Sequence, residues 1–465
     1  MTAVTFPNSA GKIPGIDKDF RPMALENRNF INAVKESGEG VPLAVCIERA
    51  DGLRSTFRTQ VFSEESARAD ANFLYVERFV KTILWSRGGW KIIIGGPADV
   101  CEAIKKAYSK GGLREFDADF MSKIYEKPFV VETTEYDKVP DTYEVANPIG
   151  RHLNGYRIGF DAGGSDMKVS AVINGEVVFS EEIIWHPKTQ SDPEYHYREI
   201  LAAMKTAASH MPKVDAIGVS SAGVYINNRT MVASLFRLVP EELFNKRIKD
   251  IYLNMQKEMG GVPLAVANDG DVAALAGAMD FNATNVMGIA MGTSEAGGYV
   301  DHQGNITGWL NELAFIPVDA NPDAAVDEWA GDYGCGVKYF SQDGVIRLAD
   351  IAGIELDPAL TPAEKLKVVQ DLLKNGDERA VRIFETIGVY LGYTVAHYAD
   401  FYDINHILIL GRVTSGEGGN IIFRVAQEIL QAEFPDLAQK IKLQLPSESY
   451  RRVGQSIAAA SLAEA

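Results

Sequence analysis

The sequence predicts an α/β protein with two lobes and a ligand site between them. Apolar, β-rich runs alternate with helical patterns along most of the chain, and a glycine-rich turn opens each of two α/β units, at residues 161–168 and 288–298. Ligands are commonly bound in clefts between such units. A chain of 465 residues is also too long for one hydrophobic core, which predicts two or three domains.

The composition argues against several classes of protein. The charged and apolar fractions are those of an ordinary soluble protein, and no apolar run approaches the ~20 residues that a membrane span needs. The three cysteines match neither a disulfide framework nor a zinc pattern, and no secretory signal is visible. The net charge of −17 lies mostly after residue 150, so no nucleic-acid partner is expected. We expect a cytoplasmic protein without a membrane partner.

Four segments are predicted along the chain. Residues 1–40 lack a clear period and are expected to be irregular, whereas residues 41–150 are expected to form an N-terminal α/β domain of unknown role. The first lobe is predicted over residues 151–284 and the second over residues 285–465, including the C-terminal helix. Residues 126–155 contain three prolines and are predicted to be an extended connector.

The predicted N-terminal domain repeats the order of elements seen in the first lobe. A hairpin, a helix, a buried strand and a second helix follow one another over residues 41–111, as they do from residue 156 to residue 223. Its hairpin turn lacks the glycine pair of the first lobe. We therefore expect a degenerate domain of the same general type, retained for packing at an interface or a lid.

The first glycine turn combines a bare backbone with charged side chains. Gly163, Gly164 and Ser165 would expose N–H groups to a phosphate, since only glycine lets a phosphate oxygen come so close. Lys168 would add positive charge, and Asp161 would position a metal ion or a water molecule. A plain hairpin turn, in which Gly-Gly is common, is the alternative.

A matching turn opens the second unit. The strand that ends there delivers Gly292 and Thr293, whose amide and hydroxyl could bind a second phosphate, and Gly297 and Gly298 would relieve crowding before the next strand. An ordinary hairpin is again the alternative. Two such turns, one in each lobe, are less expected by chance than either alone.

A third stretch ends an apolar strand and begins an alanine-rich helix. Asp269 at that strand end could accept the proton of an attacking hydroxyl, as phosphoryl transfer requires, and Asn268 could hydrogen-bond a neighbouring hydroxyl. Asp269 or Asp271 could instead cap the helix, so one of the two is expected to cap while the other faces the substrate.

A fourth stretch, residues 408–420, runs from a buried strand through glycines into a helix. The flat surface of Gly416, Gly418 and Gly419 would suit a nucleotide base or ribose. A loop that only joins the strand to the helix is the alternative.

The order of these motifs resembles that of the ROK family of sugar kinases and regulators, in the actin-like ATPase (RNase H-like) superfamily. The resemblance covers residues 156–465. It implies a bilobed actin-like ATPase fold, here with an additional N-terminal α/β domain. It also implies an ATP-dependent sugar kinase that uses ATP and Mg²⁺, the latter held with the help of Asp161, and a homo-oligomer such as a dimer.

The resemblance also implies roles for single residues. Asp269 would be the catalytic base, and Asn268, Glu312 and Gly223 would contact the sugar. The residues at the adenosine would be four members of the fourth stretch, namely Gly411, Thr414, Ser415 and Gly416.

Several positions depart from the family pattern. Phe315 stands where the family has a zinc-binding His, and Cys335 is what remains of a cysteine-rich zinc motif. Val337 and Ala267 replace two glutamates, and Arg412 replaces a glycine of the adenosine loop. The departures predict retained phosphate chemistry, altered sugar recognition and no structural zinc. We expect packing to hold this part of the sugar site instead, with Phe315, Trp329 and Tyr333 taking part.

Two functions remain open from the sequence. The first is the sugar kinase, and the alternative is a non-catalytic ROK-like regulator or scaffold that binds sugar or nucleotide. Some members of the family are repressors with an N-terminal winged helix, which the strand-rich residues 1–150 do not resemble. The sequence does not name the sugar or the hydroxyl that would be phosphorylated.

Overall fold

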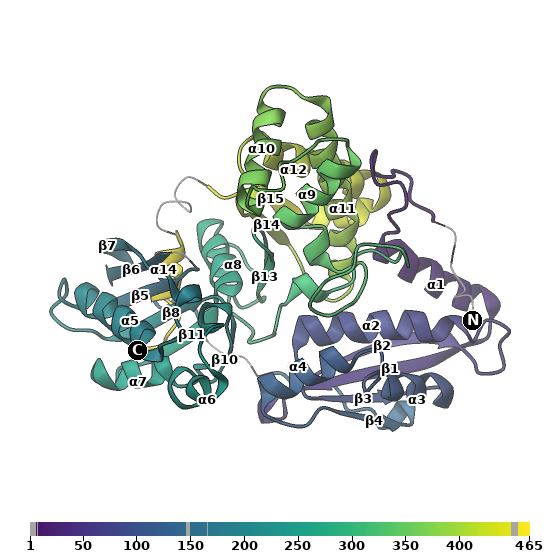
Figure 1. Ribbon diagram of the computed structural model, residues 1–465. Helices are drawn as coiled ribbons and strands as arrows, with labels where there is room; N and C mark the ends of the chain where they lie inside the picture. The colour runs from purple at the N-terminus through teal and green to yellow at the C-terminus, as the bar shows by residue number, and fades with distance from the viewer. Residues whose placement is uncertain (1–5, 7, 146–148, 165, 448–453) are drawn as a thin grey trace.

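The computed structural model describes residues 6, 8–145, 149–164, 166–447 and 454–465 (Figure 1). An N-terminal domain lies beneath the second lobe, and the first lobe lies beside both. The described residues contain no helix long and apolar enough to cross a bilayer.

The N-terminal domain contains a four-stranded sheet in the order β2-β1-β3-β4. β1 pairs antiparallel with both β2 and β3, and β3 pairs parallel with β4. The strands are β1 (Gly40–Glu48), β2 (Arg54–Phe62), β3 (Lys91–Gly95) and β4 (Val130–Thr134). The helices are α1 (Met23–Ser37), α2 (Ala71–Arg87), α3 (Ala98–Ala107) and α4 (Glu115–Tyr125).

Two expectations for this region are wrong. The segment predicted to be irregular contains α1, which begins after Pro22, ends at the left-handed Gly38 and buries Phe30 and Val34 in the core. The stretch predicted to be an extended connector contributes β4 to the sheet. β4 has no regular apolar period of its own and is stabilised by pairing with β3. The buried side chains of α1 do recur at helical spacing, but the prolines, glycines and asparagines scattered over residues 1–40 mask that pattern.

The N-terminal domain does not have the topology of the first lobe. Its third strand, β3, runs antiparallel to β1. In the first lobe the corresponding strand, β8, runs parallel to β5. The predicted α/β class is therefore confirmed, whereas the expected likeness to the first lobe is wrong, because the order of elements does not fix the strand direction.

The first lobe is built on a five-stranded sheet in the order β11-β8-β5-β6-β7. The predicted meander of β5, β6 and β7 is confirmed, and β8 and β11 add in parallel. The strands are β5 (Tyr156–Ala162), β6 (Asp166–Ile173), β7 (Glu176–Ile184), β8 (Ala216–Ser221) and β11 (Leu264–Asn268). A small hairpin, β9 (Val224–Ile226) with β10 (Arg229–Val232), and the helices α5 (Pro193–Ala208), α6 (Glu241–Leu243) and α7 (Ile251–Glu258) complete it.

The second lobe is built on a four-stranded sheet in the order β13-β12-β14-β15. β12 and β13 form the predicted hairpin, and β14 and β15 add in parallel. The strands are β12 (Val286–Met291), β13 (Glu295–Val300), β14 (His406–Leu410) and β15 (Lys442–Gln444). The helices are α9 (Gln342–Ile351), α10 (Pro362–Lys374), α11 (Glu378–Ala399), α12 (Glu417–Glu433) and α13 (Pro435–Lys440).

Two helices pack against strands of both lobes. α8 (Asp269–Asp280) and the C-terminal α14 (Gln455–Ala460) share an alanine-rich cluster with strands of both sheets. α14 lies among the strands of the first lobe, where a Cβ on Gly159 or Gly218 would meet its backbone (Figure 1). The prediction that the C-terminal helix belongs to the second lobe is therefore wrong, since its small residues pack on the first sheet.

The N-terminal domain and the second lobe share one hydrophobic core. A single cluster of buried apolar side chains extends from Phe20 and Trp85 to Phe340 and Leu443, whereas the first lobe has a cluster of its own. The N-terminal domain is thus joined to the second lobe by continuous packing.

Candidate active site

The register of the first sheet brings the predicted residues to one edge. Asp161 on β5 lies beside Ser220 on β8, and Ser220 lies beside Ala267 on β11. Because these three strands are parallel, the loops after them leave the sheet at the same edge. Asp161, Gly223 and Asp269 therefore surround one end of the sheet.

Asp161 lies close to other carboxylates at this edge. Its Oδ1 accepts a hydrogen bond of 2.5 Å from the hydroxyl of Ser220. Burial raises the pKa of Asp161 to about 6, and the charges of Asp269 and Asp166 act in the same direction. Lys168, its cross-strand partner on β6, opposes this rise. A cation would be favoured here, since it would stabilise the charged forms of Asp161 and Asp269.

The first glycine turn projects from this edge. The carbonyl of Gly163 accepts a hydrogen bond of 2.9 Å from the indole of Trp185, which fixes the start of the turn. A Cβ on Gly164 would lie 2.8 Å from the Nζ of Lys188. Ser165, the third predicted phosphate contact, lies outside the described residues.

Lys188 lies at the candidate site and was not predicted from the sequence. It lies in the short helix η3 (Pro187–Thr189) after β7, and its amine packs against the bare face of Gly164. Its charge also lowers the pKa of Asp269, which burial raises. No motif surrounds Lys188, so only the Pro-Lys turn after a predicted strand could have drawn attention to it.

Asn268 is the N-cap of α8, and the Oδ1 of Asp269 also accepts from the amide of Gly270, at 3.0 Å. The Oδ1 of Asn268 accepts from the amide of Gly270 at 2.7 Å, and its Nδ2 donates to the carbonyl of Gly223 at 2.8 Å. The prediction that Asp269 or Asp271 caps the helix is therefore wrong. Asp271 is buried and accepts from the Tyr299 amide at 3.1 Å and from the Asn311 side chain at 2.9 Å, which ties α8 to the second lobe.

Glu312 reaches the same region from the second lobe. Glu312 precedes the short helix η6 (Leu313–Phe315), and its backbone N–H donates to the carbonyl of Trp85 at 3.1 Å. Burial raises the pKa of Glu312 to about 7, with further contributions from the charges of Asp269 and Asp271. Carboxylates from both lobes therefore meet at the end of the first sheet.

The second glycine turn divides into an open part and a packed part. Gly292 and Thr293 are accessible, and within the described part of the chain a Cβ on Gly292 would meet only the carbonyl of Ser294, at 3.7 Å. In contrast, a Cβ on Gly298 would lie 2.1 Å from the carbonyl of Gly270. Gly298 is thus required for the close approach of β13 to α8, while Gly292 faces open space.

The predicted adenosine residues lie at the same end of the second sheet as Gly292. β12 and β14 are parallel neighbours, so Gly411 follows one strand as Gly292 follows the other. Gly411 has φ 104° and packs on the backbone of Met291, and the hydroxyl of Thr414 donates to its carbonyl at 2.9 Å. Ser415 and Gly416 are exposed.

The expected flat glycine surface is only partly present. Among the described residues, none places an atom within 4 Å of a Cβ added to Gly416. Gly418 and Gly419 are buried, the first against the ring of Phe384 and the second against the carbonyl of Thr414. Their inclusion in a base-binding surface is therefore wrong, because α12 begins there and turns them inward.

Aromatic packing surrounds Phe315, as expected, but with different partners. Phe315 stacks on Trp85 of α2, with ring centroids 4.2 Å apart. Tyr333 lies under the guanidinium of Arg78, 4.1 Å from its ring centroid. Trp329 is 72% exposed, so its predicted part in this packing is wrong.

A magnesium ion would need ligands from a bound nucleotide. Among the described residues, no group of three His, Cys, Asp or Glu side chains is arranged to hold a metal ion. Mg²⁺ at nucleotide sites is typically held by one or two carboxylates together with phosphates and waters. Asp161 and Asp269, at the end of the sheet, fit that limited role.

Comparisons with known proteins show the family of the chain. The family model described as "ROK family" matches residues 157–456. The chain is similar to a ROK hexokinase from Thermus thermophilus, with 17% identity, a TM-score of 0.52 and coverage of 66% of this chain and 98% of that chain. A ROK family transcriptional regulator, a homolog of the E. coli MLC protein, has 18% identity, a TM-score of 0.50 and coverage of 67% and 78%.

A third similar structure is a ROK family glucokinase from Streptomyces griseus in complex with glucose and AMPPNP. It has 20% identity, a TM-score of 0.47 and coverage of 66% of this chain and 99% of that chain. No curated protein matches the chain in sequence. Since the family model spans more than half of the chain, and solved members with the bilobed actin-like ATPase fold align with it, the chain belongs to the ROK family.

Proposed function

We propose that the protein is an ATP-dependent sugar kinase that uses Asp269 as its general base. One observation supports this best: Asp269 lies at the edge of the first sheet between a glycine turn with an adjacent lysine and a carboxylate from the other lobe. A base, an anion site and an acceptor contact are the parts that phosphoryl transfer to a hydroxyl requires.

The phosphates of ATP would be bound by both glycine turns. On the first lobe, we expect the backbone N–H groups of Gly163, Gly164 and Ser165 to bind phosphate. Lys168 and Lys188 would add positive charge. On the second lobe, Gly292 and Thr293 face open space. Asp161 would help to hold Mg²⁺, whose charge would offset the carboxylates at this edge. The adenosine would rest on Gly411, Thr414, Ser415 and Gly416.

The sugar would lie on the other side of Asp269. Asn268 uses one donor and one acceptor for the helix cap and for Gly223, so its amide keeps a further donor and lone pair for a sugar hydroxyl. Glu312 would accept from a second hydroxyl. The acceptor hydroxyl would give its proton to Asp269 while its oxygen attacks the γ-phosphorus, and ADP would leave.

The second function, a regulator that binds ligand without turnover, is favoured by the similarity to the MLC homolog. The N-terminal domain argues against the DNA-binding form of that function, because its four-stranded sheet is packed into the core of the second lobe. We also propose that the protein forms a homo-oligomer, such as a dimer.

The direct test is a coupled ADP-release screen of the purified protein with ATP and Mg²⁺ across hexoses, N-acetyl hexosamines and related sugars. The kinase predicts ADP release that depends on one sugar class. A rise in melting temperature with ATP, without ADP release under any sugar, would favour the binding protein.

A further inference from the structure

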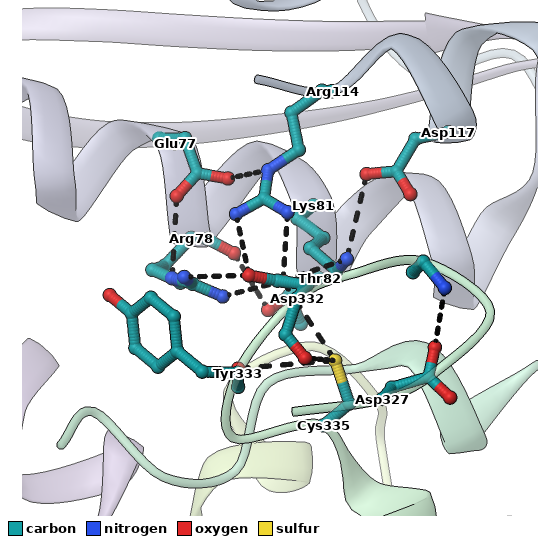
Figure 2. A network of polar contacts seen from close by, with 11 residues as sticks. Glu77, Arg78, Lys81, Thr82, Arg114, Asp117, Asp327, Asp332, Tyr333 and Cys335 are labelled. Carbon is teal, nitrogen blue, oxygen red and sulfur yellow. Dashed lines mark hydrogen bonds and ion pairs between the residues drawn. The ribbon is translucent and has the colours of Figure 1, made fainter. Parts of the chain in front are cut away.

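Helix α2 is almost fully buried although it carries several charged side chains. Every residue from Tyr75 to Arg87 is buried, including Glu77, Arg78 and Lys81. Charged side chains are rarely buried unless they are paired. Arg78 and Lys81 lie one turn apart on the face of α2 that meets the second lobe, where they contact a loop of that lobe (Figure 2).

The loop supplies Asp332 as a shared counter-ion. Arg78 binds both of its carboxylate oxygens, at 2.8 and 3.0 Å, and Lys81 and Arg114 each approach it to 2.8 Å. All four side chains are at most 4% exposed. The three cations hold the pKa of Asp332 well below its usual range, although burial opposes this. Asp332 is therefore an anion under these contacts.

The charges of this cluster balance only across the domain boundary. Among the described residues that are joined by ion pairs here, the N-terminal domain contributes the cations Arg78, Lys81 and Arg114 and the carboxylates Glu77 and Asp117 (Figure 2). Asp332 of the second lobe is the third carboxylate. Removing it would leave a net buried positive charge on the N-terminal domain, so α2 is held against this loop by more than apolar packing.

The other end of α2 is attached directly to the segment that contains Glu312. The amides of Leu310, Asn311 and Glu312 donate to the carbonyls of Arg87, Ser86 and Trp85, at 3.2, 3.1 and 3.1 Å. The last carbonyls of a helix have no partners within it, and here the amides of residues 310–312 hydrogen-bond to three of them. The Trp85 ring also stacks on Phe315, three residues after Glu312.

Both attachments of α2 act on one segment, residues 310–318. The amide of Gly336 donates to the carbonyl of Ile316 at 2.9 Å, and the amide of Val318 donates to that of Gly334 at 2.8 Å. The loop bound through Asp332 therefore lies along the segment that follows Glu312. A shift of α2 would move that segment from both sides.

We propose that α2 of the N-terminal domain is a positioning element for the acceptor site, with Trp85 and Arg78 as positioning residues that hold Glu312 through the backbone and through Asp332. The inference rests on the proposed function, in which Glu312 contacts the sugar. It assigns residues 41–150 a role in recognising the acceptor, and none in binding ATP.

The main test compares Asp332→Asn with the wild type, using the sugar of highest turnover in the ADP-release screen. The variant should lower kcat/KM for that sugar by roughly 10–100-fold, because a small misplacement of a contact has effects of that size. The KM for ATP should change by less than about threefold, since the ATP contacts lie elsewhere. Equal losses for sugar and ATP, or no loss in a folded variant, would overturn the inference.

A second pair of variants guards against a failure of Asp332→Asn to fold. Trp85→Phe keeps a ring that can stack on Phe315, whereas Trp85→Leu does not. The Phe variant should retain most of the sugar kcat/KM and the Leu variant should lose it. Asn72→Ala is the matched control, because the side chain of Asn72 on the same helix bonds to the backbone of Phe62 on β2, at 2.8 and 3.0 Å. It should lower the melting temperature without raising the sugar KM.

Hydrogen exchange separates this inference from the proposed function. The amides of residues 310–312 should exchange at least tenfold faster in Asp332→Asn than in the wild type, without any sugar present. If the wild type phosphorylates no sugar, the kinase proposal fails and the exchange result decides whether α2 holds the segment. Unchanged exchange at these amides would overturn the inference in either case.

Discussion

Asn268 and Asp269 follow one another in the chain and have different environments. The side-chain amide of Asn268 caps α8 and donates to the carbonyl of Gly223. Asp269 is the first residue of the helix, and its carboxylate lies near Lys188. The sequence selected both residues as candidates for the site. It was not sufficient to say which residue caps the helix, because Asn and Asp are equally good caps and a choice between them depends on the loop that receives the second bond.

Lys188 provides the first prediction at this scale. Lys188→Met should raise the KM for ATP roughly tenfold, since charged hydrogen bonds to phosphate contribute about 1.5–3 kcal/mol. It should also move the acid limb of the pH–rate profile to higher pH, because the lysine lowers the pKa of Asp269. Lys188→Arg should keep the position of that limb. A limb at the same pH in Lys188→Met would show that the amine does not face Asp269.

The pKa of Glu312 gives a prediction about stability. It is raised from 4.5 to about 7 by burial and by the charges of Asp269 and Asp271. The folded protein thus holds this proton more tightly than the unfolded chain, so the stabilisation is complete below about pH 4.5 and is lost as the pH rises through about 7.

Glu312→Gln removes this titration. The melting temperature of the variant relative to the wild type should therefore increase between about pH 5 and about pH 8, measured in buffers of equal ionic strength. A difference that is constant over this range would mean that Glu312 is not buried among carboxylates. The same variant should lose sugar-dependent turnover, which makes it informative for the proposed function as well.

At the scale of elements, the glycines of the second turn separate packing from ligand binding. β13 approaches α8 so closely that a Cβ on Gly298 would lie 2.1 Å from a backbone oxygen. Gly298→Ala should therefore destabilise the protein by roughly 1–3 kcal/mol, the usual cost of overpacking. Gly292→Ala should keep the melting temperature of the free protein and reduce its rise with ATP and Mg²⁺. The opposite pattern in thermal melts would exchange the two roles.

The elements that were predicted well are those whose own residues determine them. The meander of the first lobe and the strand–turn–strand of the second follow from β-rich runs separated by glycines or Asn-Gly. β4 was missed because it shows no regular apolar period and is completed by pairing with β3. α1 was missed because scattered prolines, glycines and asparagines mask its helical spacing of buried residues. The direction of β3 was also beyond the sequence, since connection order allows either pairing.

At the scale of the whole molecule, the N-terminal domain is continuous with the second lobe. The sequence predicted an appended α/β domain, and residues 78 and 81 of α2 resemble a solvated helix face when they are considered alone. Their partner Asp332 lies about 250 positions away and shares no motif with them. Such a pairing depends on the tertiary arrangement of two domains, which no local pattern records. The residues around Asp269 stand in family motifs at strand ends, so their common place at one edge of the sheet could be predicted.

The measurement that tests the central claim most directly is sugar-dependent ADP release by the wild type and by Asp269→Asn, assayed side by side with ATP and Mg²⁺. The account predicts turnover of one sugar class by the wild type and a loss of roughly 10²–10⁴-fold in the variant. The rise in melting temperature with ATP should be preserved, because Asn keeps the size of the side chain. Equal turnover by both proteins, or none by the wild type with any sugar, would contradict it.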